Sequence, residues 1–286
     1  MPEPPTVLYI FSDWSEPMGR RRHASLALLS AVSYAGVKAG LPFVALPATA
    51  VQVRPAAVGP VVLALLFGLP AVAGVVVGEL TVALWRTGGL PGLTSLYFAI
   101  GVAFQSLLAH AVWTTAAPAA DQSNPDMRTA TQLATYLLTA VVSSFGRVAV
   151  TASSLAILGE TLFHVTVSWL LPEVLLASIV LGPILLRLIV PHVDQDFFGA
   201  PAPRSIRSVL VLVGVTSLWL LLGSGFSVLL QFLRFVPDWI LRRRPVLGFF
   251  SMAIGTDGLL LQLVLGVVGT FLLARTTISC LHRARS

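Results

Sequence analysis

Four ionisable residues, Glu79, Arg147, Glu160 and His164, lie inside long apolar segments of the sequence. Charges are rare at such positions because burying them in lipid is expensive, so they mark ligand sites, proton relays or buried ion pairs. Arg147 is the most informative, because it lies in the middle of its run and a guanidinium keeps its charge in proteins. It needs either an anionic ligand or a carboxylate partner, and an ion pair with Glu79 or Glu160 is the simpler alternative.

Each acidic residue also has a simpler structural interpretation. Glu79 lies near the end of its apolar run, where a position at the lipid headgroups is equally compatible with the sequence. Glu160 and His164 are four residues apart, so they are expected to share a helix face and could bond each other at a helix end. Glu173 follows Pro172, which favours a place in the first turn of a helix.

Two further polar residues accompany these groups inside the apolar runs. Gln105 is a neutral companion that could bind a ligand or a buried charge. Lys38 could extend along its own helix to the membrane interface. The set of ligand or coupling residues predicted from the sequence is therefore Glu79, Gln105, Arg147, Glu160 and His164.

The composition indicates that lipid is the solvent for much of the chain. Of its 286 residues, 56% are hydrophobic and 10% are charged, and the mean hydropathy is +0.88. A soluble domain carries about 25% charged residues, so this surface cannot be solvated by water alone. The net charge of +6 includes arginine triplets at 20–22 and 242–244, at the ends of apolar runs. That pattern is typical of membrane proteins and argues against a nucleic-acid partner.

Apolar runs long enough to cross the membrane recur along the sequence, and they predict an all-α, polytopic bundle of about seven or eight transmembrane spans. The expected spans are residues 24–47, 58–85, 92–115, 129–157, 163–190, 207–233 and 254–276. The expected organisation is a cytoplasmic tail at 1–23, a core bundle at 24–190, a loop at 191–206 and a C-terminal pair of spans with a basic tail at 207–286.

Two of these runs, 58–85 and 129–157, are longer than one straight crossing needs. The first holds Gly68-Leu69-Pro70 and the second holds Ser143-Ser144-Phe145-Gly146-Arg147. A proline removes a backbone donor and bends or ends a helix, and we expect a break at each stretch.

The arginines also predict the orientation. The triplet at 20–22 places the N-terminus in the cytoplasm of a multi-pass protein of the cell membrane. Six crossings later the triplet at 242–244 is cytoplasmic as well, and the acidic loop 116–127 falls outside. One further span would place the basic C-terminal tail outside, which conflicts with the rule that basic segments stay in the cytoplasm. Splitting one long run into two spans would remove this conflict.

Small residues in the segment 67–80 predict close helix packing. Gly74 and Gly78 are four residues apart and form a face on which another helix can approach closely. Pro70 marks the bend that precedes this face. This interpretation requires no ligand.

The stretch RPAAVGPVVLALLFGLPAVAGVVVGEL at 54–80 resembles the MASE-type membrane-associated sensor domains of bacterial and archaeal signalling proteins. SLYFAIGVAFQSLLAHAVW at 95–113 and SWLLPEVLLASIVLGPILLRL at 168–188 are similar to later helices of that family, so the resemblance covers about residues 25–190. It implies a sensor that passes its state to a separate signalling protein.

LFGLPAVAGVVVGEL, together with LLPEVLLASIVLGPILL, also resembles the substrate-binding subunits of energy-coupling-factor vitamin transporters. Those small membrane proteins carry no ATPase of their own, so this resemblance implies a separate ATPase partner. The two spans expected after residue 205 depart from that six-helix pattern.

The sequence matches the motifs of known enzymes poorly. No His/Glu cluster has the spacing of a zinc protease, and LGSGFS at 222–227 has Leu222 where an intramembrane serine protease loop has glycine. We therefore expect a non-enzymatic module without metal or cofactor that binds a small ligand or a partner within the bilayer, most simply as a sensor. A substrate-binding subunit or small transporter, and a structural partner of a larger complex, are the alternatives.

Overall fold

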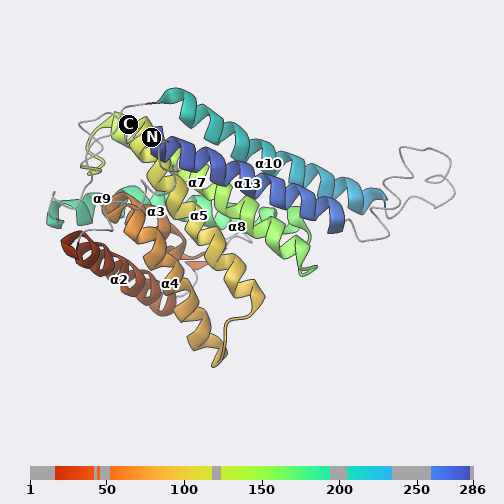
Figure 1. Cartoon of the computed structure of the whole chain (residues 1–286), viewed down its shortest axis with the longest axis horizontal. Helices are drawn as coiled ribbons and strands as arrows, with labels where there is room; N and C mark the ends of the chain where they lie inside the picture. The colour runs from red at the N-terminus through yellow and green to blue at the C-terminus, as the bar shows by residue number, and fades with distance from the viewer. Residues whose placement is uncertain are drawn as a thin grey trace, which may run out of the picture.

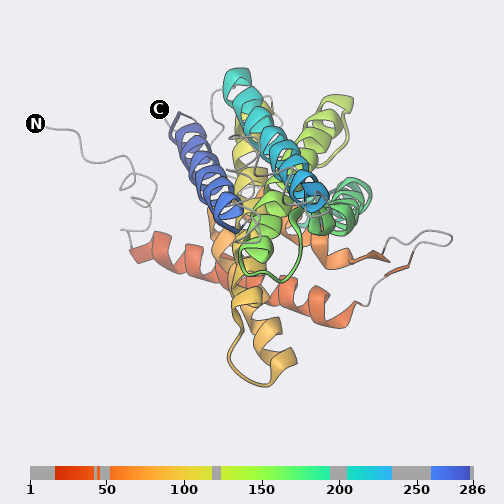
Figure 2. The ribbon, with the colours of Figure 1, turned by 90° about the vertical axis from the view of Figure 1, so that its right-hand side faces the viewer.

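The computed structural model describes residues 17–41, 44–45, 52–117, 124–193, 205–233 and 259–283. Within these ranges the protein is an all-α bundle (Figures 1 and 2), apart from one short antiparallel pair of strands. By length and composition, six helical segments can cross a membrane, so the chain is an integral, multi-pass membrane protein. Their bounds are α4 (Leu69–Thr87), α5 (Leu93–Ala116), α7 (Ala130–Ile157), the run Phe163–His192, α10 (Ile206–Leu233) and α13 (Leu259–Arg283).

The run Phe163–His192 is made of several pieces. It comprises α8 (Phe163–Leu176), the π-helical segment η3 (Ala177–Leu181), α9 (Gly182–Ile189) and a last 3₁₀ turn, η4 (Val190–His192). A π-helical turn inside an α-helix is rare and is frequently found at functional sites.

The expected count of seven or eight spans is too high for the described residues. The first expected span, 24–47, corresponds to α2 (Pro17–Gly40), which is not among the six spanning segments, because its arginines and Lys38 lower its hydropathy. After α2 come strands β1 (Val44–Ala45) and β2 (Gln52–Val53). The 3₁₀ turn η2 (Pro55–Val58) and the short helix α3 (Gly59–Phe67) follow, and together they are too short to cross.

Of the two expected helix breaks, one is present and one is not. The run 58–85 divides at Gly68, whose φ of +64° is the left-handed region that favours glycine, and α4 then begins with Leu69-Pro70. The break expected at Ser143–Arg147 is wrong, because α7 is one helix from Ala130 to Ile157. Serine and glycine weaken a helix only modestly, and packing on all sides of α7 outweighs that weakness.

The directions of the helices differ from the relative placement that the arginines predict. Contacts between α2 and α4 progress in the same order along both helices, from Ala27 against Gly74 to Lys38 against Arg86, so the two run in the same direction. No spanning helix separates them, which removes one crossing from the expected count. The end of α5 and the start of α7 therefore lie at the same end of the bundle as the start of α2, not at the opposite end (Figure 1).

Contacts between helices also place the ends of the C-terminal helices α10 and α13. The backbone N–H of Ser205 donates to Thr115 O, and Cys280 contacts the carbonyl of Ser208, so α13 ends where α5 ends and α10 begins. The end of α13 thus lies at the same end of the bundle as the start of α2 (Figure 1). The end of α10 and the start of α13, which flank the triplet 242–244, lie at the opposite end.

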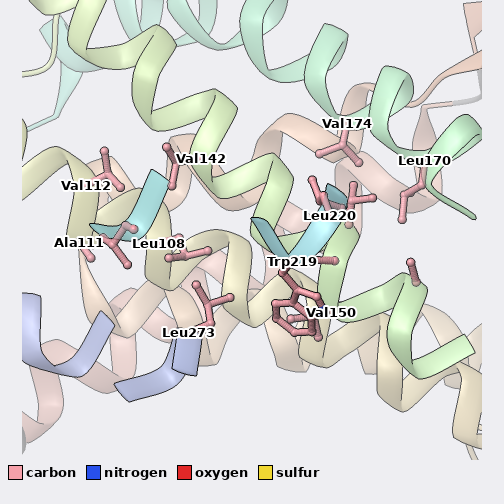
Figure 3. Close-up of a cluster of buried hydrophobic side chains, with 14 of the residues drawn as sticks. Leu108, Ala111, Val112, Val142, Val150, Leu170, Val174, Trp219, Leu220 and Leu273 are labelled. Carbon is pink, nitrogen blue, oxygen red and sulfur yellow. The ribbon is translucent and has the colours of Figure 1, made fainter. Parts of the chain in front are cut away.

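An apolar core joins the N-terminal and C-terminal helices (Figure 3). Side chains from α5, α7, α8, α10 and α13 form one buried cluster that includes Leu108, Val150, Leu170, Trp219 and Leu273. The pair α10 and α13 therefore packs on the core bundle rather than standing apart from it.

Helices α2 and α4 approach each other closely at the two glycines singled out in the sequence. A Cβ at Gly74 would overlap the backbone oxygen of Ala27 and lie 2.5 Å from the Cβ of Ser30. A Cβ at Gly78 would lie 2.8 Å from the carbonyl oxygen of Ala31. Both glycines are buried in the contact with α2. To make room for a side chain at either position, α2 would have to separate from α4.

Gly74→Ala should therefore lower the thermal midpoint of the protein in lipid nanodiscs. The added methyl group meets backbone atoms of α2, and overpacking of this kind costs about 1–3 kcal/mol. The matched control is Gly36→Ala on α2, where an added Cβ meets nothing within 4 Å, and its midpoint should stay the same or rise. An equal loss from both substitutions would contradict the close packing of α2 on α4.

Candidate functional site

Glu79 lies in the middle of α4, and two residues of α2 hold its carboxylate. Lys38 Nζ forms an ion pair with Glu79 Oε1, and the hydroxyl of Tyr34 donates to Glu79 Oε2 at 2.7 Å. Lys38 Nζ also lies 5.8 Å from the centroid of the Tyr34 ring, within range of a cation–π contact. The two side chains thus meet between α2 and α4, so Lys38 extends toward Glu79.

A second ion pair ties the chain entering η2 to α8. Arg54 Nε lies 3.3 Å from Glu173 Oε1, and the carboxylate side chain is only 6% exposed while that of Arg54 is 41% exposed. The first-turn position expected for Glu173 is wrong, because Pro172 lies inside α8 and Glu173 comes in its third turn. Neighbouring helices can satisfy the backbone carbonyl that a proline frees inside a membrane helix.

Arg147 is 6% exposed, and its hydrogen bonds are incomplete. Its Nη1 donates to Gln105 Oε1 at 2.8 Å, and Gln105 Nε2 in turn donates to the carbonyl of Ala57 at 3.3 Å. Its Nε is buried and has no hydrogen-bond partner among the described residues. The expected ion pair with Glu79 or Glu160 is wrong, because Glu79 is held by Lys38 and Tyr34 and Glu160 bonds elsewhere.

The three cations and two carboxylates form one electrostatic cluster. The charge of Arg147 acts on both Glu79 and Glu173, so the three groups lie within electrostatic reach of one another. Lys38 and Arg54 each have a carboxylate, whereas Arg147 has none among the described residues. Among the described residues, Arg147 is therefore the one of these three cations whose charge has no paired carboxylate.

This cluster lies deep in the bundle. Arg147 comes ten residues before the end of α7, or about 15 Å at the helical rise of 1.5 Å per residue. Gln105 lies at the middle of α5. Because the hydrocarbon layer is about 30 Å thick, both residues belong near its centre.

Glu160 and His164 do not belong to this cluster. Glu160 lies between α7 and α8 and accepts a hydrogen bond of 2.8 Å from Thr94, at the start of α5. His164 Nδ1 lies 2.9 Å from the hydroxyl of Ser227 on α10. The shared helix face expected for them is wrong, because α7 ends just before Gly159, whose φ is +71°, and α8 begins only at Phe163.

Sequence reasoning overlooked Tyr34 and Arg54 as members of the site. Tyr34 looks like an ordinary aromatic residue of an apolar run, and only its register against α4 brings it to Glu79. Arg54 could have been noticed as a charge immediately before Pro55 and an apolar run. Among the described residues no group of three or more His, Cys, Asp or Glu side chains is placed to hold a metal ion.

No protein-family model matches the sequence, and no curated protein and no solved structure shows significant similarity to the chain. The resemblance to sensor domains and to transporter subunits therefore remains a prediction.

Removing the Glu79 charge should destabilise the fold, because it leaves Lys38 as a buried cation without its partner. We expect Glu79→Gln to lower the free energy of unfolding by about 3 kcal/mol. The double variant Lys38→Met with Glu79→Gln should recover most of that loss, as measured by a double-mutant cycle in detergent titrations.

The control is the pair Arg128 and Asp126, whose Nε and Oδ2 lie 3.1 Å apart with the arginine side chain 67% exposed. Asp126→Asn should change the free energy of unfolding by less than about 1 kcal/mol. A coupling between Lys38 and Glu79 no larger than that of this pair, whose arginine is exposed, would show that their contact is not a buried ion pair.

Proposed function

We propose that this protein is a non-enzymatic membrane module that binds a small ligand inside the bundle at Arg147. The observation that carries the proposal is the buried guanidinium whose Nε has no partner and whose charge has no carboxylate of its own among the described residues. An arginine at the centre of a membrane helix costs about 3 kcal/mol on the insertion scale. A bound ligand would offset that cost.

The arrangement around Arg147 supports a coupling role for ligand binding. Gln105 joins the guanidinium to the backbone at Ala57, and Arg54, three residues earlier, pairs with Glu173 on α8. A ligand that binds Arg147 and shifts its guanidinium would change the contacts that η2 makes with α5 and α8. We infer a sensor in which this change is passed to a separate signalling protein.

Transport is the second candidate function, and the broken helices favour it. The apolar run 58–85 is interrupted at Gly68, and the run Phe163–His192 contains the π-helical segment η3, which packs against η2. Many transporters form their binding sites from interrupted helices near the middle of the bilayer. A carrier of this size would work alone or with a separate ATPase.

The test is native mass spectrometry of the protein extracted in its own lipids. We expect the wild type to retain a small molecule that Arg147→Gln loses. Arg275→Gln is the matched control, because Arg275 is exposed on α13, and it should retain the molecule. An identical set of bound species in wild type and Arg147→Gln would overturn the proposal.

The two functions then separate by flux. Purified protein in sealed vesicles should bind the retained molecule without moving it if the protein is a sensor. Protein-dependent accumulation inside the vesicles would favour the transporter.

A further inference from the structure

The hydrogen bonds of Arg147 fix the plane of its guanidinium and leave one side of it for a ligand. Gln105 holds Nη1 at 2.8 Å and is itself held by the carbonyl of Ala57. Nε is on the other side of the group, where it is buried and has no partner in the part of the chain that the structure describes. Arginine binds a carboxylate through two parallel N–H groups, and the Nε side supplies such a pair.

Two hydroxyls on the same helix face are also without partners. Ser144 precedes Arg147 by three residues and Thr151 follows it by four, so all three lie on one face of α7. Both hydroxyl oxygens are buried and make no hydrogen bond with any residue that the structure describes. Serine and threonine inside a helix commonly donate to the carbonyl four residues earlier, as Thr139 does to Thr135 at 2.8 Å. Ser144 and Thr151 do not use this bond, so their hydroxyls can donate to a ligand.

The contact with α5 places Thr151 beside Arg147. A Cβ on Gly101 would overlap Thr151 Oγ1, and it would also lie 3.4 Å from the carbonyl oxygen and 3.6 Å from the Cγ of Arg147. Thr151 Oγ1 and the stem of Arg147 therefore both face α5 at Gly101. Both residues therefore line the interface between α5 and α7.

From these observations we infer that the ligand is a small organic monoanion, bound by its carboxylate to the Nε side of Arg147 and to the hydroxyl of Thr151. The inference rests on the proposed function and adds the chemical class of the ligand. The charge of the cluster selects this class, since two carboxylates already balance Lys38 and Arg54. A single negative charge would balance Arg147, the one of these three cations without a carboxylate among the described residues, whereas a dianion such as inorganic phosphate would bring one negative charge more than Arg147 balances.

The experiment measures the thermal midpoint of the full chain in lipid nanodiscs during titration with sodium formate, sodium acetate or sodium phosphate. Ionic strength is kept constant with chloride, at a mildly alkaline pH where phosphate is mostly a dianion. We expect formate and acetate to raise the midpoint to a plateau, with a larger effect than phosphate.

Four variants connect the effect to the site. Arg147→Gln should abolish the rise caused by acetate, and Arg147→Lys should weaken the apparent affinity about tenfold, because lysine keeps the charge but lacks the paired N–H groups. Thr151→Val should weaken it several-fold with little change in the ligand-free midpoint. Thr139→Val is the matched control, because that hydroxyl bonds within its own helix, and it should leave the affinity unchanged.

The possible outcomes distinguish the ligand class from the proposed function. A larger rise with phosphate than with acetate, lost in Arg147→Gln, would overturn the carboxylate ligand and keep Arg147 as the binding residue. A neutral molecule retained by wild type and lost by Arg147→Gln would do the same. An acetate effect that persists in Arg147→Gln, or no effect of either carboxylate on the wild type, would overturn the inference.

Discussion

A guanidinium cannot give up its proton inside a protein, and this constraint governs the interior of the bundle. Arg147 must keep its charge at a depth where charge is expensive, so polar groups have to reach it from the surrounding segments. Gln105 and the backbone of Ala57 supply part of that environment. The described residues supply no hydrogen-bond partner for its Nε. The binding function that we propose follows from that missing partner.

The two ion pairs near Arg147 join segments outside the spanning helices to the rest of the bundle. Lys38 and Glu79 join α2 to α4, and Arg54 and Glu173 join η2 to α8. Neither α2 nor the segment formed by η2 and α3 is among the spanning helices. These polar contacts link α2 and the η2–α3 segment to the spanning bundle, and a change of charge at Arg147 would act on both pairs at once.

Features that depend on a short stretch of sequence could be predicted, and features that depend on the register between helices could not. The helix break at Gly68, the close approach at Gly74 and the depth of Arg147 follow from local residues and their spacing. The pairing of Lys38 with Glu79 does not follow from local sequence, because it depends on how α2 lies against α4. For the same reason the expected partner of Arg147 was wrong and the role of Tyr34 was overlooked.

The most direct test of the account is an experimental structure in native lipid, at a resolution that defines the groups around the Nε of Arg147. We predict density that does not belong to the protein within hydrogen-bond distance of Nε and near the hydroxyl of Thr151. A carboxylate of the protein itself, such as Glu173, bonded to that Nε would contradict the account. Arg147 would then be one half of a structural ion pair, and the binding site would have to be sought elsewhere.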